Sequence, residues 1–202
     1  MRGFVKLMAA LHLSALAFPC AAQSLPQGLF LIGQFEIGKA TVDDVQSRFG
    51  VNKPSPIEPG DGADVALCYS TGASPSAPTI VFETGALGGW KEITAYRLTK
   101  RGKRRCQLTD ASLTAISTAN GLSFRTRREL VERALSQSKP TTSWANMRVE
   151  EVYRRKPTDS EAGRIRRSGS DPNIEFDVVD TVVVRFKHGV VDDLYVKRLV
   201  SY

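Results

Sequence analysis

The stretch from Ile37 to Gly50, IGKATVDDVQSRFG, predicts a short capped helix. The organisation of the rest of the chain is inferred by comparison with this stretch. Thr41 and Asp44 have the Thr-x-x-acid spacing of a capping box, in which each side chain satisfies a backbone N–H at the helix start. Gly50 can adopt the left-handed conformation that ends a helix. Apolar residues recur at the spacing of one buried helix face, namely Val42, Val45 and Phe49.

A similar segment, LSFRTRRELVERAL, runs from Leu122 to Leu135. Its alignment with the first stretch pairs Thr41 with Thr126 and Asp44 with Glu129, so the same capping box is expected in the second helix. The apolar residues expected on the buried face of that helix are Leu130, Val131, Ala134 and Leu135. Chance similarity between two short amphipathic helices is the alternative explanation of this match.

The strand patterns that follow the two helices keep the same order. Tyr69, in ALCYS, and Tyr153, in VEEVYRR, occupy corresponding positions, and later alternating segments pair Ile93 with Leu194 and Arg97 with Arg198. The second unit needs an insertion before its last hairpin, and a polar stretch at about 156–171 supplies it. The composition of residues 158–172 favours disorder there. Because the helix and strand patterns follow in the same order in both parts of the chain, an internal repeat is favoured.

The sequence therefore predicts an α+β protein made of two tandem units, each a short helix packed on an antiparallel β-sheet. The units are expected at residues 23–106 and 107–202, after a signal peptide at residues 1–22. The expected strands are Val65–Ser70, Ile80–Glu83, Glu92–Leu98, Met147–Arg154, Thr181–Lys187 and Val190–Val200. A further short helix is expected at Ala111–Ala119. Leu194 and Val196 share one strand face and Tyr195 and Lys197 the other, which is typical of a sheet covered on one side.

The first stretch carries a resemblance to a known family. Ile37-Gly38-Lys39-x-Thr41-x-x-Asp44-Val45 with Phe49-Gly50 resembles the helix motif of the SmpA/OmlA lipoproteins, which include the BamE component of outer-membrane barrel assembly. Those proteins share their fold with the β-lactamase-inhibitor-protein (BLIP) group, in which tandem α/β units occur. Phe186-x-x-Gly189-Val190-x-x-x-Leu194-x-Val196 is similar to the closing hairpin of such a unit. The second unit departs from the motif at Ser123 and Leu135, where glycines would be expected.

The resemblance implies a non-enzymatic protein that binds other proteins in the cell envelope, in a BLIP/BamE-like fold. Because members of this group bind different partners, the resemblance does not name a partner for this chain. The protein that this chain would bind is therefore expected to be another envelope protein of unknown identity.

The N-terminus has the pattern of an export signal. Arg2 and Lys6 form a basic region, an apolar run extends from Leu7 to Phe18, and cleavage is expected after Ala22. Acylation of Cys20, as in a lipoprotein, is the less favoured alternative because Phe18 and Pro19 precede it where small residues are usual. The expected location is the periplasm.

Removal of this segment leaves Cys68 and Cys106, and two cysteines in an exported protein suggest a disulfide. Two separate buried thiols are the alternative. A metal site is not expected because two cysteines and one remaining histidine supply too few ligands, and no pattern indicates a cofactor.

His188 is the one histidine left for a catalytic triad, and it precedes Gly189 at a predicted turn, where histidine tolerates unusual backbone angles. A turn residue is the favoured interpretation, and a hydrolase that uses His188 is the alternative. Asp192 and Asp193 follow closely, but adjacent strand residues point to opposite faces. The sequence therefore predicts that the protein is not an enzyme.

Basic residues are concentrated in one short segment of this chain of formal charge +7. The residues of this segment that could bind an anion are Lys100, Arg101, Lys103, Arg104 and Arg105, with Arg97 just before them. A second cluster, inside the insertion, consists of Arg164, Arg166 and Arg167. Such runs can hold phosphate groups, and an anionic membrane surface or polyanion is the second candidate partner. A solvated link is the structural alternative, and nucleic acid is not expected after export.

Overall fold

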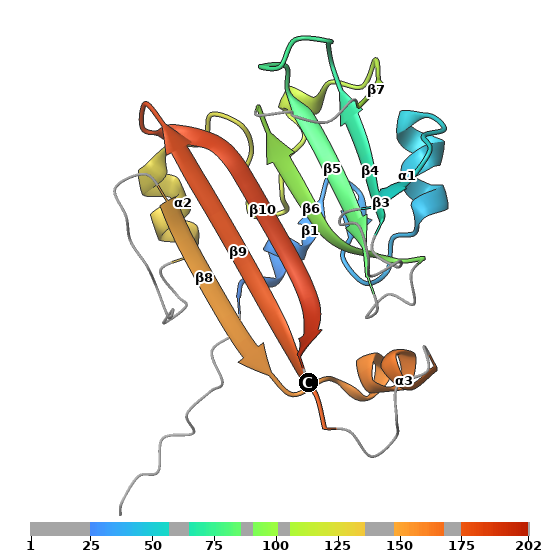
Figure 1. The fold of residues 1–202 in the computed structure, drawn as a ribbon. Coiled ribbons are helices and arrows are strands. Elements are labelled where there is room, and N and C mark those ends of the chain that lie inside the picture. Colours follow the sequence, from blue (N-terminus) through green and yellow to red (C-terminus); the bar gives the residue numbers. More distant parts are fainter. Residues whose placement is uncertain are drawn as a thin grey trace, which may run out of the picture.

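The computed structural model describes residues 25–56, 65–85, 91–100, 106–135, 148–167 and 175–201 of the 202-residue chain. The described part is a mixed α+β structure in which α-helices pack on a large β-sheet (Figure 1). In chain order the elements are η1 (Gln27–Phe30), β1 (Leu31–Ile32), β2 (Phe35–Glu36), α1 (Val42–Phe49), β3 (Ser55–Pro56), β4 (Val65–Ser70), β5 (Thr79–Thr84), β6 (Ile93–Thr99), β7 (Gln107–Leu108), η3 (Leu113–Ala115), α2 (Arg128–Leu135), β8 (Arg148–Arg155), α3 (Asp159–Arg167), β9 (Asp177–Lys187) and β10 (Val190–Ser201).

The large sheet has the strand order β3-β4-β5-β6-β10-β9-β8, and neighbours on this path are antiparallel. β7 lies off the path and pairs in parallel with β4. β6, the last strand before residue 106, pairs with the last strand of the chain, β10. The strands predicted from the sequence correspond to β4, β5, β6, β8, β9 and β10.

The predicted capped helix at the first motif is confirmed as α1. The Thr41 hydroxyl accepts a hydrogen bond from the Asp44 backbone N–H at 3.2 Å, and the Asp44 carboxylate accepts one from the Thr41 backbone N–H at 2.8 Å. The backbone and side-chain hydrogen bonds from Thr41 lower the pKa of Asp44. Gly50 follows the helix with a φ of 96°, which a side chain would make unfavourable.

The capping box predicted at the start of the second helix was wrong. Arg125 has a left-handed φ of 68°, so the chain changes direction just before Thr126. The Thr126 hydroxyl accepts a hydrogen bond from the backbone N–H of Ser123 at 2.9 Å. This hydroxyl therefore bonds to a residue before the helix rather than to the first turn of the helix. α2 then begins at Arg128.

The buried face of α2 also differs from the prediction. Val131 and Leu135 are buried, whereas Leu130 is 48% exposed. The two buried positions in α2 have the same spacing as Val45 and Phe49 in α1. Val131, rather than Leu130, is therefore the counterpart of Val45, which shifts the alignment of the two helices by one residue.

Residues 159–167 of the insertion before the last hairpin form α3, where the composition favoured disorder, and residues 168–172 lie outside the described part of the chain. Thr158 and Glu161 form a capping box at the start of α3. The Glu161 carboxylate accepts a hydrogen bond from the Thr158 backbone N–H at 2.8 Å, and the Thr158 hydroxyl accepts one from the Glu161 backbone N–H at 3.3 Å. Ile165 is buried against Phe176 and Val178, so the helix has a small core of its own. The polar composition of the insertion reflects its exposed face.

One hydrophobic core joins the two halves of the chain. The Tyr96 hydroxyl of β6 donates to the carbonyl of Leu29 in η1 at 2.6 Å, so the N-terminal segment lies against the inner face of the sheet. Of the helix predicted at Ala111–Ala119, only the 3₁₀ turn η3 is present. The inward-facing strand residues of this core include Leu67, Tyr69, Ile80, Phe82, Ile93, Tyr96, Leu98, Tyr153, Val182, Val184, Phe186, Leu194 and Val196.

The last hairpin is confirmed together with its turn. His188 and Gly189 have positive φ values of 54° and 76°, the combination that a two-residue type I′ turn requires. His188 is exposed at this turn. Leu194 and Val196 are fully buried, whereas Tyr195 and Lys197 are half-buried, as the alternation predicted.

Replacement of Thr41 by alanine removes the side-chain acceptor at the start of α1 and is expected to cost about 1 kcal/mol of unfolding free energy. Urea denaturation checks this against Thr71→Ala, which removes a hydroxyl from an exposed threonine between β4 and β5. Equal changes in the two variants would contradict the role assigned to the capping box.

Candidate functional site

One face of the large sheet carries no described helix. The three described α-helices each bury residues against the inward-facing side chains of the strands: Val45 in α1, Val131 in α2 and Ile165 in α3. In Figure 1, α2 lies behind β8 and β9. We call the opposite side the open face and define it by Glu83, Arg97, Val152, Arg154, Asp177, Thr181, Val183, Arg185, Lys187, Asp193, Tyr195, Lys197 and Leu199.

Strand register arranges the open face in rows that cross the sheet. Tyr195 lies between Arg97 on β6 and Val183 on β9, and Lys197 lies beside Thr181. Along β9 the inward positions are buried while Thr181, Val183 and Arg185 remain half-exposed. The face is therefore an accessible, mixed polar and apolar surface that spans several strands.

An ion-pair network fixes the middle of the open face. Asp193, whose side chain is 3% exposed, accepts hydrogen bonds from both Nε, at 2.8 Å, and Nη2 of Arg97. Arg185 Nε lies 4.0 Å from the same carboxylate. The hydrogen bond from Arg97 to Asp193 raises the pKa of Arg97. A buried carboxylate needs such partners because desolvation of an isolated charge is costly.

A second contact extends this network toward the first half of the sheet. The Tyr195 hydroxyl donates to Glu83 Oε2 at 2.9 Å, and the Arg97 guanidinium lies 5.9 Å from the centre of the Tyr195 ring. Side chains from β5, β6, β9 and β10 are thereby held in fixed positions. Among the described residues of the open face, basic side chains outnumber acidic ones, so the surface suits an acidic partner.

The predicted pairing of Cys68 with Cys106 is confirmed, with the two Cα atoms 4.7 Å apart. The bond holds the segment that contains β7 beside β4, across a sequence separation of 38 residues. In the chain-entropy description, closing a loop of this length stabilises the fold by about 4 kcal/mol. Cys106 also packs against Ala66 and Val81 at this end of the sheet.

The predicted anion-binding segment lies mostly outside the described residues, which include Lys100 but not Arg101, Lys103, Arg104 or Arg105. The Lys100 ammonium lies 5.7 Å from the centre of the Phe124 ring, a cation–π contact. Residues 1–22, with Cys20, are likewise outside the described part. Of the second basic cluster, Arg164 points its Nε toward Glu92 at 3.7 Å.

A buried group of charges joins α3 to the sheet. The Glu161 carboxylate accepts from both Nη atoms of Arg155 at 2.7 Å, and Asp180 accepts from Arg198 Nε at 2.7 Å. Desolvation raises the pKa of Glu161, but hydrogen bonds from Arg155 and Thr158 outweigh it and lower that pKa to about 2. The carboxylate therefore stays charged at neutral pH.

The sequence patterns missed both charge groups, for different reasons. The pair between Arg97 and Asp193 joins β6 and β10, whose pairing no local pattern indicates. For α3 a signal was present, since Thr158 and Glu161 have the same spacing as Thr41 and Asp44, but the surrounding polar composition favoured disorder. His188, the candidate catalytic residue, stands exposed at a hairpin turn, away from both groups.

Comparison with known proteins gives this site no relative: no protein family, curated protein or solved structure matches the chain. Among the described residues, no group of three or more histidine, cysteine, aspartate or glutamate side chains is placed to hold a metal ion. None of the described helices is long and apolar enough to cross a membrane.

Replacement of Glu161 by glutamine is expected to lower the unfolding free energy by about 3 kcal/mol at pH 7, because Arg155 loses its charged acceptor. The stabilisation by Glu161 is complete above its unfolded pKa of about 4.5 and is lost as the pH falls toward about 2. The difference between the two proteins, measured by urea denaturation, should therefore shrink over that range.

Glu175→Gln is the matched control, because that side chain is 93% exposed and bonds only weakly to Lys156, at 3.5 Å. Its effect should stay within about 0.5 kcal/mol at every pH. A loss in Glu161→Gln that did not change with pH would contradict the proposed ionic role.

Proposed function

We propose that this chain is an exported, non-enzymatic protein-binding module of the cell envelope, and that its open face binds an acidic surface of another protein. The observation that carries the proposal is the network that fixes Arg97 and Asp193 on the side of the sheet that no described helix covers. Arg97 and Arg185 each leave 39% of the side chain exposed, so both retain N–H groups for a partner. Rigid, pre-positioned side chains lower the entropic cost of binding.

The proposal includes an architecture of two tandem units. One unit would comprise α1 with β4, β5 and β6, and the other α2 with β8, β9 and β10. Each helix buries two residues at the same spacing, and Tyr69 and Tyr153 are buried on the first strand of their respective sets. The β6–β10 pairing would then be the contact between the two units. The resemblance of the Ile37–Gly50 motif to the SmpA/OmlA and BLIP group agrees with this arrangement.

Export is supported by the Cys68–Cys106 disulfide, because such bonds persist in oxidising compartments. The N-terminal pattern of residues 1–22 predicts the route, and the periplasm is the proposed location. A hydrolase that uses His188 is the less favoured alternative, since that side chain is exposed at the tip of the last hairpin.

Affinity capture from an envelope extract, with the chain from Gln23 onward as bait, tests the proposal. We expect one protein partner to be recovered and identified by mass spectrometry. The double variant Lys187→Glu/Lys197→Glu, on the open face, should reduce recovery about tenfold, because reversed charges repel an acidic surface. Neither lysine has a hydrogen bond or ion pair with a described residue, so the fold should be preserved.

The control is Lys53→Glu/Arg127→Glu, which makes the same change in net charge at two exposed positions that are not on the open face. Recovery with this variant should equal that of the unmodified chain. Equal recovery with both double variants would contradict binding by the open face. Recovery of anionic lipid alone, lost at high salt, would instead favour the second candidate function, anion binding through Lys100 and residues 101–105.

A further inference from the structure

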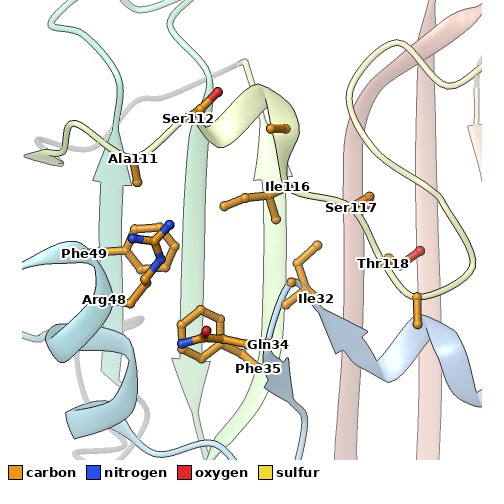
Figure 2. Close-up of a pocket in the computed structure, with 13 residues that line it drawn as sticks. Ile32, Gln34, Phe35, Arg48, Phe49, Ala111, Ser112, Ile116, Ser117 and Thr118 are labelled. Atoms are coloured by element: carbon orange, nitrogen blue, oxygen red, sulfur yellow. The ribbon is translucent and has the colours of Figure 1, made fainter.

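A pocket of about 530 Å³ opens on the helix-covered side of the sheet, opposite the open face (Figure 2). Its walls come from the last turn of α1, the β1–β2 turn and the segment around η3, which are distant in the sequence. The volume lies within the range of pockets that bind small molecules in proteins.

The base of this pocket is aromatic and apolar. Phe35 and Phe49 line it, with ring centres 5.7 Å apart, and each packs on Phe82 beneath, at 5.3 and 5.8 Å. Ile32 and Ile116 complete the apolar lining. Burial of an apolar group against this surface would be favourable, since it removes both surfaces from water.

Small side chains keep the pocket from being filled by the protein. Around η3 the lining residues are chiefly alanine and serine, such as Ala111, Ser112, Ala115 and Ser117. Leu113, in the same segment, does not line the pocket and is fully buried in the core instead. Gly33 lines the pocket beside this segment with a φ of 59° and carries no side chain to fill the space.

Hydrogen bonds within the protein hold the walls of the pocket in place. The Gly33 N–H donates to the Ser117 carbonyl at 2.9 Å, and the Ala119 N–H donates to the Leu31 carbonyl at 3.0 Å. On the α1 side, the Tyr69 hydroxyl donates to the carbonyl of Gly50 at 2.9 Å. The pocket is therefore largely formed before any molecule enters it.

Arg48 is the one ionisable side chain among the described residues that line the pocket. It is exposed, and its guanidinium has no hydrogen bond or ion pair with a described residue. Figure 2 shows it on the α1 side of the pocket, across from Ile116. Its place in the last turn of α1 suits the helix dipole, but a lysine would serve that purpose equally. A guanidinium adds two parallel donors that match a carboxylate or phosphate.

We propose that this pocket binds a small amphiphile, with its apolar body against Phe35 and Phe49 and a single carboxylate or phosphate group on Arg48. The site is separate from the open face and does not depend on the protein-binding function. Gln34 and Ser112, which also line the pocket, supply further polar groups near its opening.

Isothermal titration of the full chain with decanoate, decyl phosphate and decanol tests the proposal. We expect saturable one-to-one binding of at least one anionic probe, and binding of decanol at least tenfold weaker. The preferred anion identifies the head group as a carboxylate or a phosphate. Arg48→Gln should weaken binding of the anionic probe about tenfold. Arg48→Lys should recover only part of that loss, because lysine lacks the paired donors of arginine.

Ala115→Phe provides a second variant, since a large side chain there should occupy the pocket and abolish binding of every probe. Arg127→Gln, at an exposed arginine outside the pocket, is the control and should bind as the unmodified chain does. Thermal unfolding of each variant checks that the fold is retained. The proposal is overturned if neither anionic probe saturates, if decanol binds as tightly, or if folded Ala115→Phe binds unchanged.

Discussion

The pairing of β6 with β10 is the contact on which the rest of this structure depends. It joins the last strand before residue 106 to the last strand of the chain, with Leu98 beside Leu194 and Tyr96 beside Val196, all four fully buried. Because both strands direct these residues to the same side, the two halves share one core. The N-terminal segment crosses beneath the junction, where Tyr96 bonds to the Leu29 carbonyl and Arg198 lies 4.2 Å from the centre of the Phe30 ring.

Both candidate surfaces follow from this single sheet. Since every described helix lies on the inner side, the outer side is left to polar and small apolar residues, and the buried Asp193 is stabilised there by Arg97 and Arg185. On the inner side the segments that cover β4 to β6 do not fill all the space, because small residues surround η3. One arrangement thus leaves a mixed polar and apolar surface on one side and an apolar pocket on the other.

Local patterns in the sequence predicted the elements whose causes are local. The capping box of Thr41, the turn at His188 and the alternation along β10 depend on neighbouring residues and were confirmed. The start of α2 was misplaced because Arg125 has a left-handed conformation, and its N–H bonds to the carbonyl of Val191, far along the chain. The ion pairs of the open face and the pocket at Arg48 each combine residues from distant segments, and a single sequence contains no direct signal for such combinations.

Native-state hydrogen exchange of the whole chain tests most directly the claim that one sheet and one core unite both halves. With one shared core, amides of β5, β6, β9 and β10 should exchange only through global unfolding, with one common free energy that equals the value from urea denaturation. Two separate free energies, one for the strands before residue 106 and another for those after it, would contradict the claim. The halves would then fold independently, and the open face would not be a single rigid surface.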